Sequence, residues 1–276
     1  QMSPLMFNIA EKMALETACE VVVRDLAEAP AERRMLGNTH RLTTPESTLV
    51  TQVAAEVPLA EFTKVIETTA QVQAGSVSLI VTFNNHLGDP NGSRNAWFDQ
   101  LNITSPSGVE TTIEFEDAPA GTRITACGHQ TDAYYQLSCN GSIIIPFEVT
   151  EAGSYALELI AAGEQYGDEP ISIELSIVDS ASGKPALKRQ IQDLHQQLLG
   201  ESLTTDDPEV EATYALLLES YETRKERGVT NVNQFPVETC PNHQWRISDL
   251  DGSDPTYMVG AWINVLTYLM TDFRFL

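Results

Sequence analysis

Residues 142–178, SIIIPFEVTEAGSYALELIAAGEQYGDEPISIELSIV, contain three short apolar runs separated by two polar segments. The runs 142–149, 154–162 and 171–178 are rich in Ile, Val, Leu and aromatic residues, which favour strands. The segments between them contain Gly, Pro, Asp and Glu, and clusters with Gly and Pro mark turns. This stretch therefore predicts consecutive strands of a β-rich domain.

The same pattern of short apolar runs separated by polar segments extends from about residue 49 to residue 178. Further runs of this kind are VSLIVTF (77–83), NAWFDQLNI (95–103), ETTIEFE (110–116), TRITACG (122–128) and YYQLSC (134–139). Several short strands at this spacing indicate a β-sandwich, which we expect to be jelly-roll-like. The alternation of Ile113 and Phe115 with Glu114 and Glu116 predicts that one face of the sheet is in contact with water.

Helical periodicity flanks this region on both sides. One helix begins at Ser3-Pro4, two more follow residue 185, and a last helix after Asp254-Pro255 is apolar on most faces and should be buried. We therefore predict an α+β chain with an N-terminal helical segment (1–44), a central sandwich (45–180) and a helical region (181–276). Because the chain stops directly after the last helix, we also expect it to be a piece of a longer protein.

The formal net charge of the 276 residues is -23. Such a charge disfavours nucleic acid and anionic membrane surfaces as partners, and it suits neutral ligands, divalent cations or simply solubility. No apolar run is long enough to cross a bilayer, so we expect no membrane insertion.

Four cysteines are present, and none forms a C-x-x-C pair. This spacing gives no support for a zinc ribbon, a thioredoxin-type redox pair or a covalently attached haem within the chain. Cys127 and Cys139 flank a segment that could fold back as a hairpin, so we predict a disulfide there. Cys19 could then pair with Cys240 by elimination. The alternative is four buried free thiols in a cytosolic protein.

The loop FNNHLGDPNGSRNAWFDQL, residues 83–101, concentrates oxygen-bearing side chains behind a strand. Ca²⁺ takes six to eight oxygen ligands from carboxylates, amides, backbone carbonyls and water. We therefore predict a calcium site at the rim of the sandwich, with the candidate ligands Asn85, His86, Asp89, Asn95 and Asp99. The alternative is an ordinary turn-rich loop, because Asn, Asp and Gly are also the residues of tight turns.

This loop resembles the F-x-N-D…D-R-N-x-x-V-D pattern of calcium-dependent xylan-binding modules, carbohydrate-binding module families 36 and 60. The matching residues are Phe83, Asn85, Arg94, Asn95 and Asp99. His86 and Ser93 stand where the families have Asp, which removes anionic oxygen from the expected site. The resemblance implies a sandwich whose calcium ion is also coordinated by sugar hydroxyls. Residues 155–178 are similar to the opening strands of these modules but follow the loop here, an order that a circular permutation would produce.

The helical flanks resemble segments of large exported proteins of planctomycetes and myxobacteria. These proteins combine cytochrome c domains with such a module, and the similar segments here are residues 187–200 and 262–276. The resemblance implies export to the periplasm, the cell surface or the medium. It also implies that any redox centre lies outside this chain.

Trp97 and Tyr166 are candidate platforms for a sugar ring, because an aromatic face packs on the apolar side of a pyranose. We also assign Arg94 and Glu169 to the ligand site. Trp97 alternates with Phe98, so one of the two rings must point inward, and Trp97 could equally be part of the core.

We expect a non-catalytic module that binds a xylan-like polysaccharide with calcium, within an exported multidomain protein. The alternative is a structural or protein-interaction module that has lost its sugar site and docks onto a redox or assembly partner. An enzyme would need a carboxyl pair in a cleft, whereas the acidic pairs at Glu114/Glu116 and Asp168/Glu169 are expected to face solvent.

Overall fold

The computed structural model describes residues 4–27, 32–59, 61–89, 92–125, 127–164, 166–180, 182–228, 240, 254 and 256–272, without the side chains of residues 4, 5, 7, 88 and 89. The chain divides into two compact units. One, here called the sandwich unit, is Leu49–Ser180. The other, here called the helical unit, combines Gln1–Thr48 with Ala181–Leu276, so the helices on both sides of the sandwich in sequence belong to one unit.

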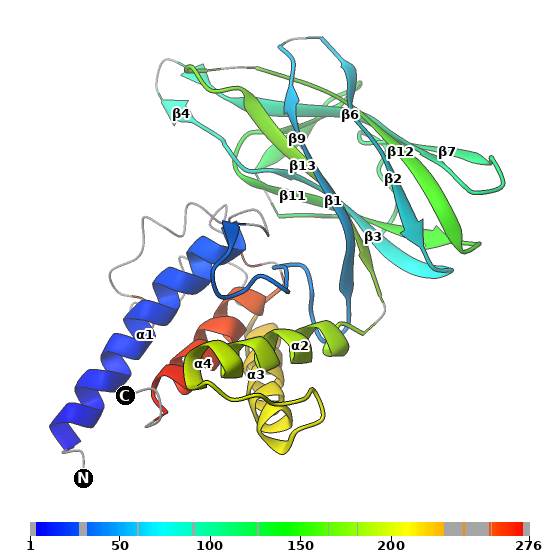
Figure 1. The fold of residues 1–276 in the computed structure, drawn as a ribbon. Coiled ribbons are helices and arrows are strands. Elements are labelled where there is room, and N and C mark those ends of the chain that lie inside the picture. Colours follow the sequence, from blue (N-terminus) through cyan, green and yellow to red (C-terminus); the bar gives the residue numbers. More distant parts are fainter. Residues whose placement is uncertain are drawn as a thin grey trace. The chain divides into compact units, whose positions relative to one another are not determined.

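The sandwich unit consists of two sheets packed face to face (Figure 1). The five-stranded sheet has the order β1 (Thr48–Val57), β13 (Ile171–Asp179), β3 (Gly75–Phe83), β11 (Gly141–Val149), β8 (Arg123–Ile124). The six-stranded sheet has the order β2 (Thr63–Val72), β12 (Gly153–Glu164), β6 (Asn95–Thr104), β10 (Tyr135–Leu137), β9 (Gly128–Gln130), with β7 (Glu110–Glu114) also paired to β6. A separate short pair is β4 (Gly88–Asp89) with β5 (Gly92–Ser93). The predicted α+β fold with a β-sandwich is confirmed; the circular permutation stays a prediction.

Alternate residues of the central strands fill the space between the sheets. Strand β3 contributes Val77, Leu79, Val81 and Phe83, each at most 3% exposed. Full burial of one such side chain stabilises the fold by about 1.5–3 kcal/mol. Strands β1 and β2 were not identified individually from the sequence, because polar residues on their outer positions interrupt the apolar pattern.

Strand β6 contains a β-bulge at Asp99. Ala96 and Phe98 lie in the core on one side of it, and Leu101 and Ile103 lie in the core on the other. The inward side chains are therefore separated by three positions instead of two, which requires one extra residue in the strand.

The same bulge marks the place where β6 changes its neighbour. Phe98 is paired with Tyr135 of β10, whereas Gln100 is paired with Glu114 of β7. The Asp99 carbonyl accepts a hydrogen bond of 2.9 Å from the amide of Phe115. Asp99 therefore sits where β10 and β7 diverge.

The helical unit contains α1 (Pro4–Ala27), α2 (Lys184–Leu194), a π-helical turn (His195–Leu199), α3 (Pro208–Arg227) and α4 (Met258–Met270). Helix α4 packs against both α1 and α3 and is buried along almost its whole length, as its apolar sequence predicts (Figure 1). Asp207 caps α3 by accepting the Glu209 amide, and Gly228 ends that helix in the left-handed conformation.

A disulfide between Cys19 and Cys240 holds α1 in this unit, with 6.0 Å between the Cα atoms. The structure thus shows the pairing that elimination had left open as a possibility. Within the described residues, no helix combines the length and the apolar character needed to span a membrane.

Candidate functional site

The side chain of Asn85 is tied to the start of β13. Its Oδ1 accepts the amide of Ser172 at 2.8 Å, and its Nδ2 donates to the Pro170 carbonyl at 2.6 Å. The amide group that was predicted as a metal ligand therefore connects the 84–94 loop to a neighbouring strand.

His86 is held by two hydrogen bonds. Its Nδ1 lies 2.8 Å from the Arg94 carbonyl, and because a carbonyl only accepts, Nδ1 carries the proton. The His86 amide donates to Oδ1 of Asn140 at 2.6 Å. The ring also meets the Phe83 ring edge to face, with 6.2 Å between centroids. These contacts fix the loop against β3.

Arg94 is only 2% exposed, although it was predicted to contact ligand. Its Nη1 donates to the Asn85 carbonyl at 2.7 Å and to Glu169 at 3.2 Å, and its Nη2 donates to the Tyr166 carbonyl at 3.2 Å. The Glu169 side chain remains 77% exposed. Arg94 therefore fastens the 84–94 loop to the 166–169 loop.

Tyr166 also belongs to this junction. Its ring lies against Gly92 so closely that a Cβ at that position would be 2.3 Å from Cδ2 of the ring, which only glycine permits. Tyr166 is half-buried rather than fully displayed.

Asn95 is 4% exposed, and its Nδ2 donates to Oγ of Ser93 at 2.7 Å and to Glu164 at 3.0 Å. The side chain of Asp89 lies outside the described residues. The structure thus places Asn85, His86 and Asn95 in hydrogen bonds with protein groups.

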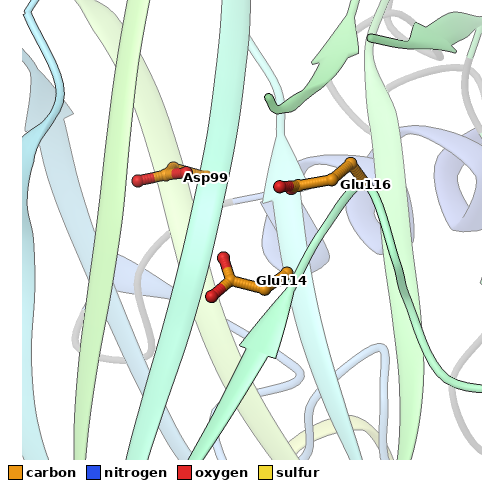
Figure 2. Close-up of side chains that lie close together, drawn as sticks. All are labelled: Asp99, Glu114 and Glu116. Carbon is orange, nitrogen blue, oxygen red and sulfur yellow. The ribbon is translucent and has the colours of Figure 1, made fainter. Parts of the chain in front are cut away.

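Asp99 is brought together with two residues that the sequence suggested would face solvent. The carboxyl oxygens of Asp99, Glu114 and Glu116 lie within 4.8 Å of one another, and all three side chains are half-buried. Figure 2 shows them gathered beside β6. We call this group the acidic cluster. It could hold a metal ion.

The acidic cluster is electrostatically unfavourable without a cation. Burial raises the pKa of Asp99, and the nearby Glu116 raises it further. The pKa of Glu114 is also raised, first by burial and then by Glu116, Asp99 and Asp117. Every ion pair between described residues lies elsewhere, and the buried Oε2 of Glu116 has no hydrogen-bond partner.

Three aromatic rings pack on one another around Trp97 of β6. Trp97, two residues before Asp99, stacks on Tyr134 with 5.5 Å between centroids and 27° between planes. Phe62 lies 5.4 Å from Tyr134 and 6.4 Å from Trp97. We call these rings the aromatic trio. Phe98 takes the inward position, at 0% exposure, so the outward alternative holds for Trp97.

The disulfide between Cys127 and Cys139 is confirmed, with 5.4 Å between the Cα atoms. It closes the β9–β10 hairpin that carries Tyr134. Disulfides are consistent with an exported protein.

Tyr134 and Phe62 are not among the candidates predicted from the sequence, and Glu114 and Glu116 were expected only to face solvent. The E-x-E spacing at the end of β7 was visible in the sequence, but its approach to Asp99 depends on the pairing of β6 with β7.

A comparison with protein-family models gives no match, and a comparison with curated proteins gives none either. The fold and the site therefore define the protein in physical terms: a β-sandwich unit with an acidic cluster able to hold a metal ion, joined in sequence to a disulfide-linked helical unit.

Proposed function

We propose that the sandwich unit is a non-catalytic module that binds calcium at the acidic cluster and a xylan-like polysaccharide on the aromatic trio. The observation that carries the proposal is that a group of three carboxylates and a group of three partly exposed rings both include a residue of β6, Asp99 in the first and Trp97 in the second.

The donor set suits a hard cation. Three carboxylates offer up to six oxygens, and Ca²⁺ takes six to eight oxygen ligands, with water or ligand hydroxyls completing the shell. Burial first, and the neighbouring carboxylates second, raise the pKa values of Asp99 and Glu114, and a divalent cation would neutralise the negative charge gathered there.

The aromatic trio supports a sugar ligand. Trp97 and Tyr134 provide rigid apolar surface, and stacking of this kind contributes about 0.5–1.5 kcal/mol beyond burial for aromatic pairs. The resemblance of the 83–99 segment to xylan-binding modules supports the choice of polysaccharide. In this proposal the predicted metal ligands Asn85, His86 and Asn95 shape the rim rather than coordinate the ion. Arg94, predicted to contact the sugar, fastens two loops together instead.

Calorimetry with CaCl₂, followed by xylo-oligosaccharides with and without chelator, tests the proposal. We expect calcium binding that is weakened at least about tenfold in Glu114→Gln, because one carboxylate of the small donor set is lost. Glu110→Gln is the matched control, since Glu110 is exposed on the same strand outside the acidic cluster. No heat with calcium and none with xylan would overturn the proposal.

A structural or protein-interaction module is the second candidate. It is favoured by the use of the Asn85, His86 and Arg94 side chains in internal hydrogen bonds. This candidate would be supported if the purified protein contained no metal and gave no binding heat with xylan in calorimetry.

A further inference from the structure

The two disulfides differ in their access to solvent. Cys19 and Cys240 are 0% and 6% exposed within the helical unit. Cys127 is exposed, and Cys139 is half-buried. Because thiol–disulfide exchange requires a reductant to reach a sulfur atom, the Cys127–Cys139 bridge should be reduced first.

The exposed bridge fastens the open end of a short hairpin. Cys127 directly precedes β9, and Cys139 follows β10 by two residues. The amide of Ser138 donates to the Cys127 carbonyl at 2.9 Å, so one backbone hydrogen bond accompanies the covalent link. Strands β9 and β10 span only three residues each, and such a hairpin has little stability of its own.

This hairpin carries groups on both halves of the candidate site. Tyr134 lies between its strands and stacks on Trp97. Gln130, at the end of β9, donates from Nε2 to the Glu116 carbonyl at 2.6 Å. Loosening the hairpin would therefore disturb the aromatic trio and the backbone that presents Glu116.

We propose that the Cys127–Cys139 disulfide is a redox-sensitive strap that holds the β9–β10 hairpin in register at the edge of the six-stranded sheet and so positions Tyr134 and Glu116. The effect on ligand binding rests on the function proposed above. The selective reduction and the release of the hairpin do not.

The reductant is a dithiol. One of its thiolates attacks Sγ of the exposed Cys127, the Cys127–Cys139 bond breaks, and Cys139 leaves as a thiolate that takes up a proton. The second thiol of the reductant then releases Cys127, giving two cysteine thiols and one oxidised dithiol. The amide of Cys127, 2.7 Å from Sγ of Cys139, favours negative charge on that leaving sulfur.

The first test is partial reduction of the native protein with dithiothreitol, followed by alkylation and peptide mapping. We expect Cys127 and Cys139 to be labelled at least about tenfold faster than Cys19 and Cys240, since only the first pair is accessible. Equal rates, or faster labelling of the buried pair, would overturn the proposal.

The second test follows the Trp97 indole proton by NMR, assigned with Trp97→Phe. Nε1 of Trp97 is buried, so its exchange with solvent requires local opening. We expect exchange to accelerate at least about tenfold after selective reduction, because the cross-link no longer restrains the hairpin. Cys127→Ser/Cys139→Ser should behave in the same way while the β3 and β11 amides stay protected, which shows that the sandwich remains folded.

If the Trp97 indole proton exchanges no faster in the reduced protein or in the double serine variant than in the oxidised protein, the strap proposal is wrong. Calcium titration of oxidised and reduced protein then separates the two proposals. If the oxidised protein binds no calcium, the proposed function fails while the Trp97 result still decides the strap. If the oxidised and the reduced protein bind calcium with equal affinity, the proposal that the disulfide positions Glu116 is wrong.

Discussion

At Asp99 the backbone leaves the regular strand, and the carboxylate comes to lie beside two other acidic side chains. Because burial and these neighbours raise its pKa and that of Glu114 in the folded state, both groups cost stability when ionised. The free energy of unfolding should therefore fall as the pH rises through the raised pKa values, and recover as the pH is lowered toward the ordinary carboxyl range.

We accordingly expect Asp99→Asn to stabilise the protein at pH 7 in the presence of chelator, by roughly 0.5–1 kcal/mol for removal of one like charge. At pH 4 the gain should shrink. On the proposed function, saturating calcium should reverse the order, because the wild type would then gain stability from the bound ion. Urea unfolding at both pH values measures this, and equal stability of variant and wild type under all conditions would contradict the electrostatic account of the acidic cluster.

Arg94 and Glu169 differ sharply although they form an ion pair. Arg94 is buried and donates to two backbone carbonyls, whereas the Glu169 side chain is 77% exposed. We expect Arg94→Lys to destabilise the sandwich unit by about 2–3 kcal/mol, because lysine cannot reproduce the planar fork of donors. Glu169→Gln should change stability by less than about 0.5 kcal/mol. Thermal unfolding of the two variants makes the comparison, and equal effects would count against the anchoring role of Arg94.

At the scale of elements, the start of α4 depends on a buried carboxylate. Asp254 is 2% exposed, and its Oδ2 lies 3.4 Å from the Gly260 amide in the first turn. Burial raises the pKa of Asp254 to about 6. Hydrogen bonds from the backbone amides of Val259, Gly260 and Met258, together with the charge of Arg224, act in the opposite direction. The Arg224 guanidinium packs directly on Gly260, where a Cβ would lie 1.9 Å from its Cζ, so a larger residue at this position would displace the Arg224 side chain.

This geometry predicts a pH dependence for the helical unit. Since the pKa of Asp254 is higher in the folded than in the unfolded state, its ionisation opposes folding above about pH 6. Lowering the pH from 7 to 5 should raise the free energy of unfolding by about 1 kcal/mol through this group. The indole signal of Trp262 in α4 reports the transition, and Asp254→Asn should lack this part of the pH dependence. An identical pH profile in the variant would contradict it.

Many elements could be predicted because their signals are local. Asp207-Pro208 and Gly228 delimit α3 as expected, and the alternation in 95–103 gave the approximate limits of β6. Within the predicted strand 122–128, Arg123–Ile124 form β8 beside β11, whereas Gly128 already begins the next strand, β9. Strand propensity alone could not reveal where a partner strand ends.

At the scale of the whole molecule, each unit has its own core. The core of the sandwich unit runs from Val57 to Ile177, entirely within Leu49–Ser180. We therefore expect residues 49–180, expressed alone with the Cys127–Cys139 bridge, to unfold cooperatively and, on the proposed function, to have the calcium affinity of the full chain. Circular dichroism and calorimetry check this, and a chain that stays unfolded would show that the unit depends on the remainder of the protein.

The sequence by itself determined the sandwich, the flanking helices and the Cys127–Cys139 hairpin, because apolar period, caps and cysteine spacing act over a few residues. Only the tertiary structure decided what Asp99 faces. A bulge shifts the alternation of β6 by one residue, and the pairing of β6 with β7 brings Glu114 and Glu116 to it. Strand register is set by contacts between distant segments, so no local pattern around residue 99 could identify these neighbours.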